Sequence, residues 1–196
     1  PVEVATRGMK AIRAYFEDLS KAGASGGNHY FFGIAIDSYS DDSIPAAPGR
    51  EAEVQQLAEV LEKRYDFHRF AMLQGAQATA ATIRARLEEL SKKVAERNDT
   101  VIIYFAGQVS DANGMGFFSH DMEKIRDVVF YKAIEGMRAR HVLLIVDFYF
   151  FASSGGHSRS LSSERQTYSS RWILHRQDPL HENRFTPALT AFLNSL

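Results

Sequence analysis

The chain has 196 residues, of which 45% are hydrophobic, and its formal net charge is −1. This length predicts one domain with a sizeable core, and the composition is typical of a soluble globular protein rather than a disordered or polybasic one, so we expect no nucleic-acid partner. No apolar run reaches about 18 residues and the first residues mix charges of both signs, so we expect no membrane partner, no secretory signal and a cytoplasmic location.

Cysteine is absent from the chain, which excludes disulfides, thiolate metal sites and a cysteine nucleophile. The seven histidines are scattered without HExxH or HxH spacing, so we expect no metal site. No GxxxxGKS/T or GxGxxG motif follows a predicted strand, and we therefore expect no cofactor.

The first part of the chain predicts an N-terminal element followed by a single domain. Residues 3–21 place apolar side chains at helical spacing, and residues 23–27 are rich in glycine. We assign residues 1–28 to an N-terminal helix and connector and residues 29–196 to one domain.

Within that domain, apolar runs alternate with amphipathic ones. The runs that predict buried strands are residues 29–37, 67–73, 100–107 and 141–151. The amphipathic patterns predict helices at residues 50–65, 79–98 and 127–138. Thr79 is a candidate N-cap, and the predicted inward-facing residues are Val54, Leu57, Ala58, Leu61, Ile83, Leu87, Leu90 and Val94.

The last third of the chain completes the predicted fold. Residues 115–119 predict a short hairpin arm, residues 152–170 a flexible loop rich in serine and glycine, residues 171–175 a short strand and residues 185–196 a final helix. Repeated strand–helix units predict an α/β fold, a three-layer α/β/α sandwich with a mostly parallel sheet.

Two strand ends are the first places to search for function, because ligands collect at the carboxyl ends of parallel strands. The first is followed by Gln108 and the second carries Asp147. The polar loop 38–49 follows the predicted strand at residues 29–37 and contains Asp41 and Asp42. These acids suit a cation or a basic peptide, although paired acids in a loop are more often simply solvated. Trp172 is a candidate apolar wall for a peptide, or a core residue.

The two strand ends, TVIIYFAGQVS and HVLLIVDFYFFAS, resemble the places where caspase-like cysteine peptidases, including metacaspases and bacterial orthocaspases, carry YF-S/A-G-His-G and D-x-Cys-x-S-G. The resemblance extends over roughly residues 29–196: HYFFGIAIDSY is similar to the first strand of the family, REAEVQQLAEVLEKRYDF to its following helix and strand, and FFSHD to its hairpin. It implies the caspase-hemoglobinase fold and a His/Cys dyad for peptide-bond hydrolysis.

When the family motifs are placed on this sequence residue by residue, both residues of the dyad are missing. The family histidine falls on Gln108 and the family cysteine on Tyr149, while Val109 replaces the glycine after the histidine. Glutamine cannot accept a proton and a phenol without a basic partner is a poor acyl nucleophile, so we expect both positions to be inert. We expect the aromatic run FYFF to fill the former site with apolar side chains.

Three interpretations follow. The first is a catalytically inactive caspase-like domain that acts by binding a protein or peptide, as a monomer or weak dimer; a natural pseudoenzyme and an engineered variant of such a scaffold would share these features. The second is a hydrolase with relocated machinery, in which Ser153 or Ser154 is activated by His120 or His157. The third is a folded scaffold without activity.

Overall fold

A computed structural model describes residues 27–42, 46, 48–94, 98–110, 116–150 and 168–177. Within these ranges the chain forms a seven-stranded sheet with the main order β2-β1-β3-β6-β7. The four strands β2, β1, β3 and β6 are parallel, and β7 is antiparallel to β6. The strands are β1 (His29–Ala35), β2 (Phe67–Gln74), β3 (Thr100–Ser110), β4 (Gly116–Phe118), β5 (Lys124–Arg126), β6 (His141–Phe150) and β7 (Tyr168–Gln177).

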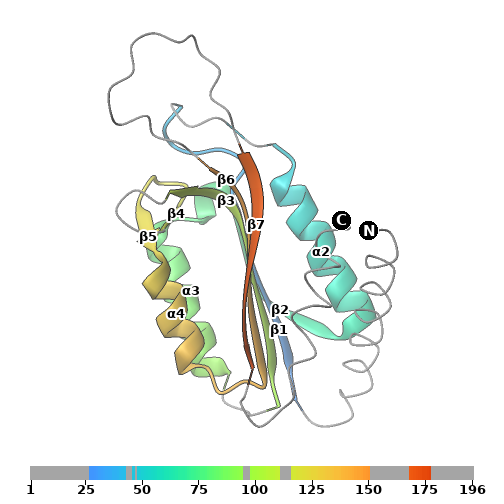
Figure 1. Cartoon of the computed structure of the whole chain (residues 1–196). Coiled ribbons are helices and arrows are strands. Elements are labelled where there is room, and N and C mark those ends of the chain that lie inside the picture. Colours follow the sequence, from blue (N-terminus) through green and yellow to red (C-terminus); the bar gives the residue numbers. More distant parts are fainter. Residues whose placement is uncertain are drawn as a thin grey trace, which may run out of the picture.

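Helices cover both faces of this sheet. One face carries α2, and the other carries α3 and α4, which lie side by side (Figure 1). The helices are α2 (Arg50–Tyr65), the short 3-10 helix η2 (Gly75–Gln77), α3 (Ala80–Lys93) and α4 (Asp127–Gly136). The prediction of an α/β fold with a mostly parallel sheet between helical layers is confirmed for the described residues.

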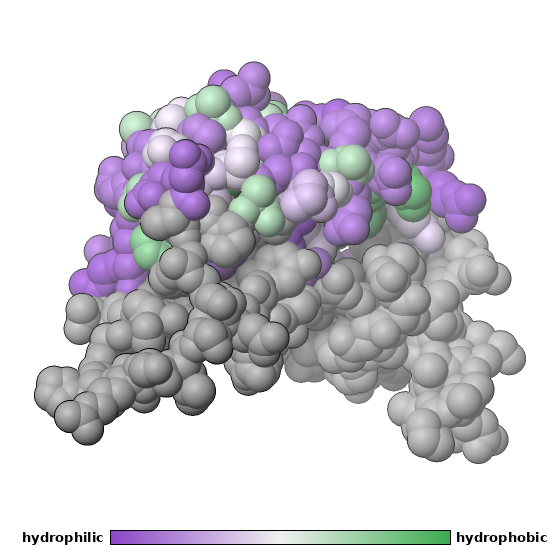
Figure 2. Space-filling view, turned by 90° about the horizontal axis from the view of Figure 1, so that it is seen from above, coloured by the Kyte–Doolittle hydropathy of each residue, from purple (hydrophilic) through white to green (hydrophobic). Residues whose placement is uncertain are grey.

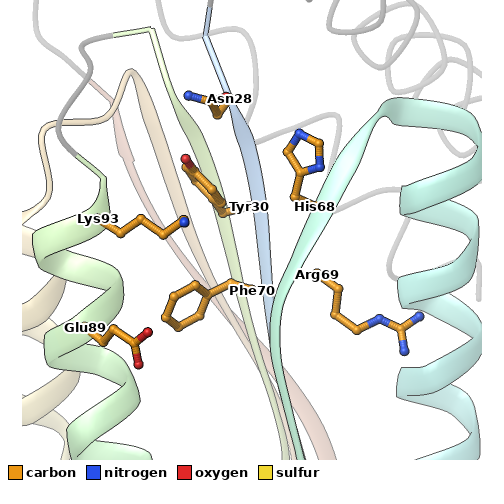
Figure 3. A pocket seen from close by; sticks show the side chains of 7 residues that line it. All are labelled: Asn28, Tyr30, His68, Arg69, Phe70, Glu89 and Lys93. Atoms are coloured by element: carbon orange, nitrogen blue, oxygen red, sulfur yellow. The ribbon is translucent and has the colours of Figure 1, made fainter.

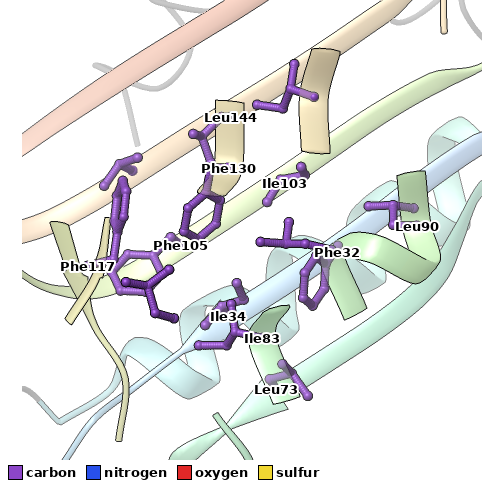
Figure 4. Packing of buried hydrophobic residues seen from close by; sticks show 14 of the residues in the cluster. Phe32, Ile34, Leu73, Ile83, Leu90, Ile103, Phe105, Phe117, Phe130 and Leu144 are labelled. Carbon is purple, nitrogen blue, oxygen red and sulfur yellow. The ribbon is translucent and has the colours of Figure 1, made fainter. Parts of the chain in front are cut away.

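Each face of the sheet has its own hydrophobic core because successive residues of a strand point to opposite faces. Figure 4 shows the larger cluster, in which Phe32 and Ile103 of the sheet meet Ile83 of α3 and Phe130 of α4. The smaller cluster packs Val54, Ala58 and Leu61 of α2 on the opposite face. The predicted inward-facing residues are confirmed in both helices: all are buried except Leu57, which is partly buried against the smaller cluster.

The N-terminus of α3 is capped by two side chains. Thr79 Oγ1 accepts a hydrogen bond from the Thr82 N–H at 3.2 Å, which confirms the predicted N-cap. The Asp121 carboxylate accepts another from the Ala80 N–H at 3.0 Å. Burial alone would raise the pKa of Asp121, but the hydrogen bonds from the Ser119 hydroxyl and the Ala80 N–H hold it below its ordinary value. The turn between β4 and β5 is thereby fixed to α3.

Two strands, β3 and β7, are longer than predicted. β3 continues three residues past Gly107 to Ser110, and the predicted hairpin arm is confirmed as β4, which pairs antiparallel with this extension. The expected strand at residues 171–175 is confirmed and extended to Tyr168–Gln177, so residues 168–170 are strand and not loop. The predicted helices at 3–21 and 185–196, and the loop at 152–167, lie outside the described residues.

Candidate functional site

The two strand ends singled out in the sequence lie side by side. β3 and β6 pair in parallel over ten residue pairs, from Thr100–His141 to Val109–Phe150. Gln108 is in register with Tyr149, the two positions at which the caspase-like motifs have histidine and cysteine. Both positions lie inside continuous strands rather than in the loops after them. The backbone of this region is therefore a hydrogen-bonded ladder.

Gln108 is buried, with 3% of its surface exposed, and its backbone N–H donates a hydrogen bond to the Tyr39 hydroxyl at 2.6 Å. Its side-chain Oε1 is also buried and has no hydrogen-bond partner among the described residues. The next residue, Val109, is fully buried. This position lacks both a titratable group and access to solvent.

The Tyr39 side chain packs against the carboxyl end of β3, on the face of the sheet that α3 and α4 cover. A Cβ added to Gly107 would lie 2.9 Å from the Tyr39 hydroxyl, so only glycine permits this close approach. Tyr39 is 7% exposed, and burial raises the pKa of its hydroxyl well above the ordinary value for tyrosine. The hydroxyl is therefore neutral over the physiological range and serves as the partner of a buried N–H.

Asp37, which follows β1, determines where α2 begins. Its two carboxylate oxygens accept hydrogen bonds from the N–H groups of Gly49 and Glu51, each at 3.0 Å. These are donors that a helix N-terminus leaves without intrahelical partners. Arg50 lies between the two bonded residues, so the cap also fixes the position of its side chain over the sheet.

Arg50 reaches across the sheet to Asp147 of β6. Its Nη1 donates a hydrogen bond to the Asp147 carbonyl oxygen at 3.0 Å and lies 3.8 Å from the Asp147 carboxylate. The Tyr104 hydroxyl donates to the second carboxylate oxygen at 3.2 Å. The side chains of Arg50 and Asp147 are 7% and 11% exposed. Asp147 is thus paired within the chain and shielded from water.

The other residues predicted from the sequence are spread more widely. Asp41 and Asp42 are exposed on the loop after β1. The backbone of Trp172 lies in β7, in register with Val146. Ser153, Ser154 and His157 lie outside the described residues.

His120 is held against the same loop. Its Nδ1 donates to the Ser38 carbonyl oxygen at 2.8 Å, and its own carbonyl oxygen accepts from the Ser40 N–H at 2.9 Å. A carbonyl oxygen only accepts, so Nδ1 must carry the proton. His120 is therefore hydrogen-bonded to the residues on both sides of Tyr39. The role of His120 as a base for a serine remains a prediction.

The polar groups of the described ranges offer no metal site, since no group of three or more His, Asp or Glu side chains is placed to hold an ion there. No helix of those ranges is long and apolar enough to cross a membrane. Figure 2 looks from above onto the end where α2 begins in Figure 1. In that view the coloured surface is mostly hydrophilic, with scattered hydrophobic residues.

Three contributors to this site were missed by sequence reasoning: Arg50, Tyr104 and Tyr39. Arg50 had a detectable signature, because a cation in the first turn of a helix opposes the helix dipole and so indicates a role outside the helix. Tyr104 is a hydroxyl within an otherwise apolar strand, and a buried tyrosine usually requires a partner. The backbone N–H that Tyr39 bonds and the carboxylate that Tyr104 bonds are far away in sequence, which is why spacing did not reveal them.

Comparisons with known proteins address the fold alone. No protein-family model and no curated protein matches the sequence. Among solved structures, the crystal structure of protein GSU0716 from Geobacter sulfurreducens is similar, with a TM-score of 0.53 and 15% sequence identity over 62% of this chain. The match covers 50% of that chain, so the present sequence spans about half of its length. At this identity the likeness supports the α/β architecture.

The Tyr39 hydroxyl is expected to stabilise the carboxyl end of β3. Tyr39→Phe leaves the buried Gln108 N–H without its partner and should lower the free energy of unfolding by about 1–3 kcal/mol at neutral pH, measured by urea denaturation. The folded pKa of Tyr39 lies above that of the unfolded chain. The contribution is therefore fully present below about pH 10 and declines as the pH rises further, so the two proteins should converge in stability. Tyr131→Phe, on α4, is the control at neutral pH. Equal effects of the two variants would contradict the assignment.

The Arg50–Asp147 pair should behave as a buried ion pair. Arg50→Met leaves the Asp147 carboxylate without its cation and should lower the free energy of unfolding by about 3 kcal/mol. Adding Asp147→Asn should recover part of that loss, because the uncompensated charge is removed. Arg86→Met breaks an exposed pair with Glu89 and should cost less than about 1 kcal/mol. An Arg50→Met variant as stable as Arg86→Met would show that the pair does not stabilise the fold.

Proposed function

We propose that this domain is a catalytically inactive relative of the caspase-like cysteine peptidases and acts by binding a protein or peptide. The motifs at the two strand ends support this, as does an α/β sheet in which those ends are neighbours. Such a domain would retain the caspase-like fold without its chemistry.

The observation that carries the proposal is the register of β3 and β6. Gln108 and Tyr149 are paired, so the two positions of the family dyad would be adjacent as a nucleophile and its base must be. Glutamine and tyrosine at these positions replace the base and the nucleophile that acyl transfer requires. Burial of Gln108 supports the same conclusion, because a base must be within hydrogen-bond reach of its substrate.

The Arg50–Asp147 pair bears on how a peptide would bind. A basic side chain that sought the Asp147 carboxylate would have to displace Arg50, which is held in place by the cap of α2. Displacement would leave one buried cation without its partner, at a cost of several kcal/mol. The carboxylates of Asp41 and Asp42 are exposed to solvent rather than buried, so we assign peptide contacts to the loop rather than to the strand ends.

The absence of catalysis is tested with fluorogenic peptides that carry a basic or an acidic residue before the scissile bond, with and without calcium. We expect hydrolysis no faster than in buffer, and no labelling by a fluorophosphonate probe. The matched variants are Gln108→Ala and Tyr149→Phe. Turnover that either variant abolishes would overturn the proposal, and labelling at Ser153 or Ser154 would establish the relocated hydrolase instead.

Binding through the loop is tested by fluorescence anisotropy with a labelled tetralysine peptide. The double variant Asp41→Asn/Asp42→Asn should weaken binding, and the difference should shrink as salt screens the exposed charges. Glu88→Gln, an exposed carboxylate on α3, is the control for general charge effects. If tetralysine binds no more weakly to the loop variant than to the control, peptide contacts do not lie at Asp41 and Asp42.

A further inference from the structure

A pocket of about 420 Å³ lies at the opposite, amino end of the parallel strands, between the sheet and α3. Its volume is in the range of small-molecule sites. Figure 3 shows that β1, β2 and α3 all contribute to its walls. The lining residues are Asn28, Tyr30, His68, Arg69, Phe70, Glu89 and Lys93.

Three rings line one part of this pocket. The Tyr30 and His68 rings lie 6.5 Å apart and are tilted by 51°, and Phe70 is packed edge-on against the buried Phe32 ring at 6.0 Å. Phe70 is held by the core yet remains half-buried, and His68 is exposed. Ring faces that are fixed by packing provide a preformed apolar surface against which a planar ligand can stack.

The charges around the pocket are unequal. Arg69 points away toward α2 (Figure 3). Its guanidinium forms a two-pronged pair with Glu62, with both distances 2.8 Å. Glu89 is paired with Arg86. Lys93 pairs with no acid among the described residues; its Nζ lies 5.7 Å from the centre of the Tyr30 ring. Among the described residues that line the pocket, Lys93 is therefore a cation without an acidic partner, and it lies beside the Tyr30 ring.

We propose that this pocket binds a small aromatic carboxylate. The ligand's ring would lie against Tyr30, His68 and Phe70, and its carboxylate would accept a hydrogen bond from the Lys93 ammonium. His68 makes no hydrogen bond to another described residue, so its ring nitrogens are available to a polar group of the ligand. A neutral aromatic would forgo the charge interaction, and a simple anion would forgo the stacking.

The experiment titrates the full chain with indole-3-acetate and follows backbone amide shifts by NMR. Indole-3-acetate should shift residues lining the pocket in a saturable manner. Tryptophol, which has the ring without the charge, and acetate, which has the charge without the ring, should each bind at least about tenfold more weakly. Shifts at other sites, or equal binding of tryptophol, would overturn the proposal.

Variants separate the pocket from general surface charge. Lys93→Gln should raise the Kd for indole-3-acetate by about tenfold, as expected for loss of one charged hydrogen bond. Lys92→Gln is the matched control, because Lys92 is the neighbouring residue and its Nζ is paired with Glu88. Phe70→Leu should weaken the binding of indole-3-acetate without affecting the binding of acetate. Equal effects of Lys92→Gln and Lys93→Gln would exclude Lys93 as the anion's partner.

Discussion

The parallel pairing of β3 with β6 is the interaction on which the described fold depends. These two strands share ten consecutive residue pairs, and each also bonds to a further strand, β1 or β7. Their apolar residues supply both cores, since alternate positions face α2 or the α3–α4 layer. Gln108, Asp147 and Tyr104 lie on this pair of strands, and Tyr39 and Arg50 are hydrogen-bonded to it.

Polar contacts at the carboxyl end form a connected series. Asp37 caps α2, the cap places Arg50, and Arg50 neutralises Asp147 beside Tyr104. On the other face, Tyr39 satisfies the Gln108 N–H. In an open catalytic cleft such groups would be directed at substrate. Here they bond to one another, which explains how the Arg50–Asp147 pair and the buried backbone N–H of Gln108 are tolerated at the edge of the core.

The sequence predicted the fold better than the site, for a physical reason. Hydrophobic periodicity is local, so it located β1, β2, β3 and β6 and the buried faces of α2 and α3. Local propensity also identified Thr79 as a cap. Strand length was less predictable, because Gln108 extends β3 by pairing with β6, and Val109 by pairing with β6 and β4. Arg50 and Tyr39 have partners about 97 and 69 positions away, a relation that one sequence does not encode locally.

The two ends of the sheet differ in the contacts that must be broken before a ligand can bind. At the carboxyl end, a ligand that bonded to Asp147 would first have to break its contacts with Arg50 and Tyr104, so the gain is offset by what is lost. At the amino end, the contact that Lys93 makes with the described residues is with the Tyr30 ring, an interaction worth about 0.5–1 kcal/mol where the cation is exposed. A charged hydrogen bond contributes more than that. This difference supports the proposed site at Lys93, which has no acidic partner in the described part of the chain, even though an α/β sheet ordinarily places its ligands at the carboxyl ends of its strands.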